Sequence, residues 1–147
     1  MGDKIGLDCK LYRAAALNGT APSAASWNEI TKAREVNTNL EAAEADVSSR
    51  ANNTWRATRP TLKDATLEFE LLWDPADTQV EAIRDAYLNG TQLALAAMDG
   101  DITVSGSEGF VADYYITSFQ RGEPLEEGVT VSVTAKAHSD QQWYEVA

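Results

Sequence analysis

Residues 61–73, TLKDATLEFELLW, decide the fold class of this chain. From Leu67 to Trp73 every second side chain is large and apolar, and Glu68 and Glu70 stand between them. Alternation with a period of two places the apolar side chains on one face of an extended strand and the polar ones on the other. The stretch therefore predicts a strand that packs one face on a core and leaves the other face polar.

A single helix is predicted directly after this strand, over residues 77–88. Asp77 or Thr78 can cap its first turn, because such side chains accept hydrogen bonds from the N–H groups that the helix leaves unsatisfied. Asn89 and Gly90 can end it. We expect its apolar face to consist of Val80, Ile83 and Tyr87, with Ala86 beside them.

Periodic apolar residues predict further strands on both sides of this unit. They are residues 5–12, a weak region from Trp27 to Val36, and residues 92–98, 102–104, 110–120 and 129–138. The core face of the first strand is expected to hold Ile5, Leu7, Cys9 and Leu11. Residues 14–26 are expected to be a loop, and residues 37–46 fit a helical face loosely. This order predicts one mainly-β domain over residues 1–147, a β-sandwich or a small barrel with one flanking helix.

Charge is distributed unevenly along the chain, which carries a formal net charge of −11. Residues 1–60 hold 8 basic and 7 acidic side chains, whereas residues 61–147 hold 4 basic and 16 acidic ones. Tight nucleic-acid binding needs clustered Lys and Arg, so this balance argues against it. The asymmetry is typical either of a solvated acidic face or of two complementary surfaces on a self-assembling subunit.

Neither secretion nor a membrane anchor is expected. No apolar run approaches the length of a membrane span, and the N-terminus lacks the apolar segment of a signal peptide. Cys9 is the only cysteine, which excludes an intrachain disulfide.

Residues with catalytic chemistry are scarce. His138 is the single histidine, and the sequence indicates no Cys–His pair, no Ser–His triad and no zinc ligand set. Glu68 and Glu70 could serve glycoside hydrolysis, but a solvated acidic face is the simpler interpretation because no aromatic cleft motif accompanies them. We therefore expect no enzymatic activity, no metal and no cofactor.

Residues 48–60, SSRANNTWRATRP, form a long polar loop between predicted elements. The loop is basic, with Arg50, Arg56 and Arg59 and no acidic residue, and Trp55 is its only large apolar side chain. A loop of this length in a compact domain is usually functional or disordered. Two interpretations stay open: Trp55 packs back onto its own core and the arginines are solvated, or the loop contacts a neighbouring subunit.

Several blocks of the sequence resemble major tail tube proteins of tailed phages and prophages. The first block runs from Ala45 to Trp73 and contains DVSSR, WRAT, LKDA and LEFE. The helix over residues 77–88 and the strand over residues 92–98 follow in the same order. Later blocks run from GFV at residue 109 through SF at residue 118 to PLEE at residue 124. The resemblance covers roughly residues 4–140, and it lies in blocks and their spacing rather than in a catalytic signature.

This resemblance implies a structural protein of the virion tail, assembled in the host cytoplasm. Six copies would form a ring whose inner sheets join into a lumen barrel. The rings would stack, contact other tail proteins, and let DNA pass without specific binding. The resemblance also favours an extended conformation for residues 37–46. Expected ring-interface residues are Arg50, Asn52, Asn53, Trp55, Arg56 and Arg59. Expected acidic residues in the lumen are Glu68 and Glu70. The alternative is that these two side chains face the solvent outside the tube.

The alternative is a small β-sandwich binding module for a carbohydrate or protein ligand. Its anchors would be Trp27, Trp55 and Trp143, because exposed tryptophans bury a large area on binding. A binding module predicts a monomer or dimer in solution, whereas a tube protein predicts rings.

Overall fold

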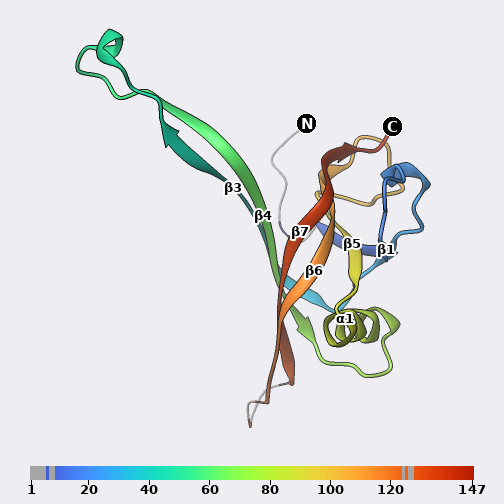
Figure 1. The fold of residues 1–147 in the computed structure, drawn as a ribbon. Helices are drawn as coiled ribbons and strands as arrows, with labels where there is room; N and C mark the ends of the chain where they lie inside the picture. The colour runs from blue at the N-terminus through green and yellow to red at the C-terminus, as the bar shows by residue number, and fades with distance from the viewer. Residues whose placement is uncertain (1–5, 7–8, 124, 126–127) are drawn as a thin grey trace.

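The computed structural model describes residues 6, 9–123, 125 and 128–147, which form one antiparallel sheet and one α-helix (Figure 1). The sheet has seven strands in the order β2-β1-β5-β6-β7-β4-β3. The strands are β1 (Lys10–Ala15), β2 (Asn28–Glu29), β3 (Ala33–Asp46), β4 (Thr58–Leu72), β5 (Gln92–Met98), β6 (Glu108–Gly122) and β7 (Thr130–Glu145). The helix is α1 (Thr78–Asn89), and two 3-10 helices are η2 (Pro22–Ala24) and η3 (Arg50–Asn52). The mainly-β prediction and the extended conformation of residues 37–46 are confirmed.

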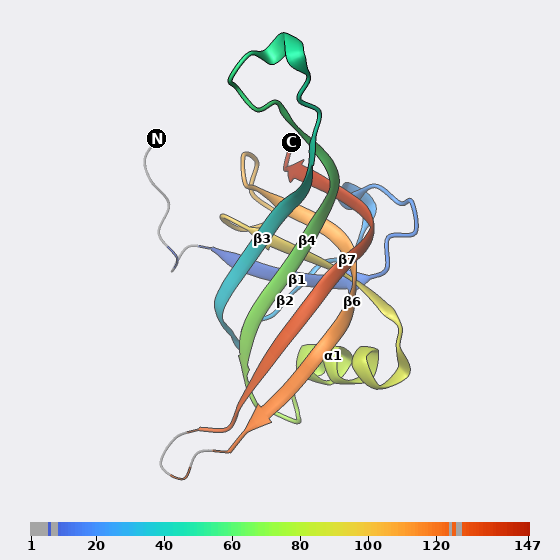
Figure 2. The same cartoon turned by 60° about the vertical axis from the view of Figure 1, so that its left-hand side comes forward.

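The sheet bends over on itself because β6 and β7 each belong to two halves. The β3–β4 half consists of β3, β4, residues 130–136 of β7 and residues 116–122 of β6. The β1–β5 half consists of β2, β1, β5, residues 108–115 of β6 and residues 137–145 of β7. The β6–β7 register shifts around Asp113 and between Ile116 and Ser118, and such irregularities bend strands. Figure 2 shows β3 and β4 crossing over β1. The sheet is not closed, since β2 and β3 are its end strands.

The main core lies between the two halves and under α1. Leu67, Phe69 and Leu71 of β4 are at most 3% exposed, as the alternation in this strand predicts. The β1–β5 half contributes residues such as Leu95 and Tyr114. Each large apolar side chain that leaves water in this way stabilises the fold by about 1.5–3 kcal/mol.

Helix α1 begins and ends with the expected capping residues. The Asp77 carboxylate accepts hydrogen bonds from the backbone N–H groups of Gln79 and Val80, at 2.9 and 3.4 Å. Gly90 ends the helix in the left-handed region with a φ of 66°. The buried face is Val80, Ile83 and Ala86. The prediction of Tyr87 on that face is wrong in part, because this residue lies in the last turn and is 42% exposed.

A second apolar cluster covers the opposite face of the β1–β5 half. Residues 16–27 lie over that face with Leu17 and Trp27, so the segment expected to be a plain loop is the cover of this cluster. The strand residues beneath it are Tyr12, Ala14, Ala94, Ala96, Met98 and Val111.

Strand β1 is therefore buried on both faces, and two expectations for it are wrong. Tyr12, expected on the polar face, is 5% exposed because the cover lies above it. Cys9, expected in the core, is exposed because the strand begins only at Lys10. Ile5 and Leu7 lie outside the described residues.

Residues 102–104 are not the predicted strand. The Asp101 carboxylate accepts hydrogen bonds from the backbone N–H and the hydroxyl of Thr103, at 2.8 and 2.7 Å. The backbone N–H of Val104 donates to the carbonyl of Asp101. These local bonds compete with a strand ladder and close a turn between β5 and β6.

A buried carboxylate connects the cover to the sheet. Asp113 of β6 is 0% exposed and accepts hydrogen bonds from the backbone N–H groups of Leu17 and Asn18, at 2.7 and 3.1 Å. Both oxygens thus satisfy backbone donors at the start of the cover. If the Asp113 side chain were removed, these two N–H groups would lose their acceptors.

We expect Asp113→Asn to destabilise the protein by about 1–3 kcal/mol, because one buried acceptor becomes an N–H donor that faces another donor. Urea unfolding followed by circular dichroism measures the change. Asp140→Asn is the matched control, since Asp140 accepts from Gly19 of the same segment at an exposed position. Equal stability losses in the two variants would contradict the structural role of Asp113.

Candidate assembly interface

Two strand edges of the β3–β4 half lack partners in the described part of the chain. β3 pairs only with β4. Residues 116–122 of β6 pair only with β7, because the pairing with β5 ends at Tyr115. All neighbours in the sheet are antiparallel, so these two outer edges run in opposite directions. Long open edges are templates for pairing with another chain, and monomeric proteins normally cover them.

A two-stranded arm projects from the sheet beside one of these edges (Figure 1). The arm comprises residues 40–65, in which the two strands pair with each other and β4 does not pair with β7. Leu40 and Leu62 on the arm are 54% and 80% exposed. An isolated two-stranded ribbon is marginally stable in water. Apolar side chains on such a ribbon favour contact with another surface.

The arm tip, residues 47–57, is held by its own hydrogen bonds. The Ser49 backbone N–H donates to the Asn52 side chain at 2.7 Å, and the Ala57 backbone N–H donates to the Ser48 hydroxyl at 2.6 Å. Asn53 adopts a positive φ of 56°. The predicted loop over residues 48–60 is therefore too long, because η3 interrupts it and Thr58–Pro60 belong to β4.

All six residues expected at an interface lie at this end of the arm. Trp55 is 81% exposed, so it does not pack back onto its own core. Arg56 lies 3.9 Å from the Asp46 carboxylate, with both side chains largely in solvent. Hydrogen bonds from the Ser48 side chain and backbone lower the pKa of Asp46, which keeps this carboxylate charged. Arg50 belongs to η3 and Arg59 to the start of β4.

The outward face of the β3–β4 half is polar. Directly paired residues share a face, and Glu68 pairs with Asn37 and Thr134. Glu70 lies 3.6 Å from Arg34 across the strand pair. The paired positions on this face include Arg34, Asn37, Asn39, Glu41, Asp64, Thr66, Glu68, Glu70, Ser118, Gln120, Ser132, Thr134 and Lys136. Carboxylates outnumber cations here, so the face is acidic.

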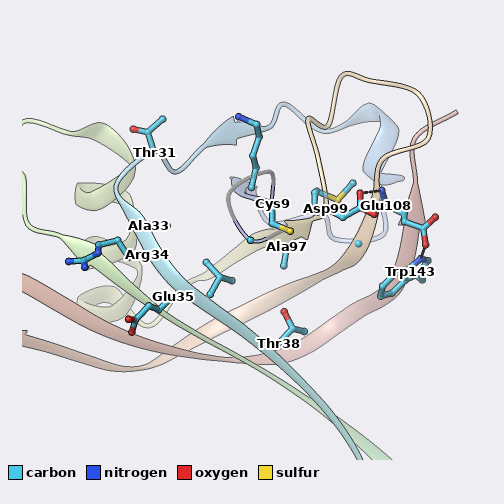
Figure 3. Close-up of a pocket in the computed structure, with 15 residues that line it drawn as sticks. Cys9, Thr31, Ala33, Arg34, Glu35, Thr38, Ala97, Asp99, Glu108 and Trp143 are labelled. Carbon is cyan, nitrogen blue, oxygen red and sulfur yellow. Dashed lines mark hydrogen bonds between the residues drawn. The ribbon is translucent and has the colours of Figure 1, made fainter. Parts of the chain in front are cut away.

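A groove that the sequence did not indicate opens between β3 and the ends of β5, β6 and β7 (Figure 3). We name it the β3 groove; its volume is about 780 Å³. Trp143 lies at its rim, 61% exposed, and donates its indole N–H to the Glu108 carboxylate at 3.2 Å. Its other lining residues include Cys9, Ala33, Val36, Thr38, Ala97 and Met98.

The remaining candidates form no reactive centre. His138 is exposed, lies 2.8 Å from the Gln92 side chain and packs roughly perpendicular to the Tyr115 ring. Within the described ranges no three His, Cys, Asp or Glu side chains are placed to hold a metal ion. The helices that the structure describes include none long and apolar enough to cross a membrane.

The three tryptophans that a binding module would use are dispersed. Trp27 packs on the second cluster and donates its indole N–H to the Pro22 carbonyl. Trp55 lies at the arm tip, and Trp143 lies at the β3 groove. They therefore do not form one platform for a ligand.

Comparison with known proteins identifies relatives of this arrangement. The family model described as "Phage tail tube protein" matches residues 16–141. No curated protein sequence is significantly similar to the chain. Among solved structures, the tail of an empty gene transfer agent particle, refined with C6 symmetry, is similar at a TM-score of 0.74 and 16% identity, covering 97% of this chain and 99% of that one.

The SPP1 tail tube is similar at a TM-score of 0.75 and 16% identity, covering 97% of this chain and 80% of that one. A chain of the anti-feeding prophage baseplate gives 0.60 and 7% identity, covering 99% and 98%. At these identities the structural matches show a shared fold.

We expect Trp55→Ala to change the free energy of unfolding by less than about 0.5 kcal/mol, because the side chain is largely in solvent. Phe69→Ala, in the core, is expected to lose about 3–5 kcal/mol. Urea titration of both variants at low protein concentration makes the comparison. A loss of several kcal/mol in Trp55→Ala would mean that the tip packs on the domain.

Proposed function

This chain belongs to the phage tail tube protein family, and from that premise we propose that six copies close into a ring, that rings stack into a tube, and that DNA passes through its lumen. As a family member the chain is a structural component of the virion tail and not an enzyme. The observation that carries the proposal is the pair of open, oppositely directed strand edges on one half-sheet.

Ring closure follows from joining the β6 edge of one copy to the β3 edge of the next. Because the two edges run in opposite directions, this join continues the antiparallel pattern of the half-sheet. The contact uses two different surfaces, so copies repeat head to tail until the rotation closes. Six-fold closure is supported by the C6 symmetry of the similar tail structure. Closure also removes both edges from solvent.

The acidic face is proposed to line the channel. In each copy α1 and the β1–β5 half lie on the core face of the β3–β4 half. A ring of joined half-sheets has room for those parts only on its outside, so the face with Glu68 and Glu70 turns inward. Carboxylates on the wall repel the phosphates of DNA, which lets the duplex slide without specific binding.

The arm is proposed to contact the neighbouring ring. Residues 58–65 of β4 continue the strand direction beyond the joined sheet by about 25 Å, which carries the tip past the rim of its own ring. The tip presents Trp55 with Arg50, Arg56 and Arg59, and Asn52 and Asn53 shape its turn. Tryptophan and arginine dominate protein interfaces, the first by buried area and the second by bidentate pairing with carboxylates. Other tail proteins would meet the same surfaces at the ends of the tube.

Purified protein is expected to form rings or tubes in negative-stain micrographs at high concentration. The triple variant Arg50→Ala/Trp55→Ala/Arg56→Ala is expected to lose the tubes while keeping its circular dichroism spectrum. Each single arginine variant should have a smaller effect, because an exposed ion pair contributes about 1 kcal/mol or less. A chain that stays monomeric by light scattering at all concentrations, with no tubes, would refute the proposal. Loss of fold together with tubes would make the arm part of the core.

Glu68→Lys/Glu70→Lys tubes, assembled in the presence of linear duplex DNA at low salt, are expected to hold DNA that a nuclease cannot reach. The reason is that the channel wall changes from repelling to attracting phosphates. Glu81→Lys/Asp85→Lys, with the same charge change on α1, is the control and should bind only nuclease-sensitive DNA outside. Identical nuclease sensitivity in both variants would place Glu68 and Glu70 away from the lumen.

A further inference from the structure

The exposed end of α1 carries apolar side chains that the fold of one copy buries only in part. Tyr87 stacks on Phe119 of β6, with ring centroids 6.2 Å apart, and is still 42% exposed. Leu88, the next residue, is 68% exposed. Phe119 pairs with the buried Val133, so this stack lies on the core face of the β3–β4 half. In Figure 2 α1 extends past β6 on the side opposite to β3.

The β3 groove lies at the other end of the same half-sheet and on the same face. Ala33 and Thr38 line the groove, and they pair with Leu71 and Leu67, which are buried in the core. Val36, in the β3 bulge between them, is 38% exposed. The opposite wall of the groove is formed by the end of β5 and by Trp143 (Figure 3). One edge of the half-sheet thus carries an apolar projection. The other edge carries a recess with apolar lining residues such as Val36, Met98 and Trp143, which charged residues also line: Lys10, Arg34, Glu35, Asp99 and Glu108.

We propose that Tyr87 and Leu88 of one copy occupy the β3 groove of the next copy in the ring. This inference rests on the ring proposed above, in which the β6 edge of one copy joins the β3 edge of the next. Continuity of the sheet across that join keeps the core face on one side. The part of α1 that extends past β6 therefore lies over β3 of the neighbour, against Val36 and Trp143. A second copy of this chain is the occupant that this geometry selects.

The contact gives the ring an apolar component beside the backbone hydrogen bonds of the edges. Edge pairing alone carries little side-chain specificity, because any strand offers the same N–H and C=O groups. Aromatic and aliphatic side chains that enter a recess select one partner and one register. The helix end thereby determines the register in which the β6 edge of one copy joins the β3 edge of the next.

Disulfide trapping tests the contact directly. Leu88→Cys and Val36→Cys are combined in a Cys9→Ser chain, assembled and oxidised. We expect a ladder of crosslinked species that ends at the closed ring on a non-reducing gel. Leu88→Cys with Val104→Cys is the matched control, since Val104 is a similarly exposed valine in the turn between β5 and β6, and it should give no ladder. Rings that assemble but do not crosslink through residues 36 and 88 would overturn this inference, whereas the proposal of a ring would still hold.

A second measurement uses charge. Leu88→Asp is expected to raise the concentration needed for half-assembly by about tenfold or more, because the carboxylate would lose its hydration in a groove whose cations, Lys10 and Arg34, already pair with Glu29 and Glu70. Val104→Asp, at a site that is 55% exposed and outside both surfaces, should change it by less than about twofold. Circular dichroism confirms that both variants fold. Normal assembly of Leu88→Asp would also overturn the inference, and absence of rings in the unmodified chain would refute both proposals.

Discussion

Unsatisfied backbone hydrogen bonding at two strand edges is the constraint on which the rest of this structure depends. β3 and residues 116–122 of β6 each present a row of N–H and C=O groups with a strand partner on one side only, within the described chain. Water can satisfy them in an isolated copy, but so can any extended chain. Joining edge to edge satisfies both rows with one contact that repeats head to tail. The proposed lumen face, arm and helix contact all take their positions from this join.

Strand β4 makes the core and the proposed channel wall from one alternating sequence. Leu67, Phe69 and Leu71 pack inward, and Glu68 and Glu70 point to the opposite face. A slip by one residue would turn the carboxylates into the core, so the register of this strand is strongly specified. The core therefore also determines which charges the polar face presents. The carboxylates of the proposed channel wall therefore need no structural element beyond the strand that also builds the core.

The arm shows how a surface can be ordered before it meets a partner. Its tip is closed by hydrogen bonds among Ser48, Ser49, Asn52 and Ala57, although no core lies beneath it. Because these bonds already restrict the backbone, a contact made by Trp55 loses less conformational entropy than one made by a loop that must first be ordered. The β1–β5 half is ordered in a similar way, since Asp113 binds the backbone N–H groups of Leu17 and Asn18 at the start of the segment that covers the second cluster.

The sequence by itself determined the local structure: the alternation in residues 67–73, the bounds of α1 between Asp77 or Thr78 and Gly90, the mainly-β class and the basic, polar composition of the segment around Trp55. These features depend on periodicity and on side-chain chemistry within a few residues, which a sequence displays directly. Only the tertiary structure decided that Tyr12 is buried, that Cys9 and Tyr87 are exposed, and that β3 lies opposite Trp143 across a groove. The physical reason is that burial and edge exposure depend on which distant strands become neighbours, and strand order is set by packing over long sequence separations that no local pattern encodes.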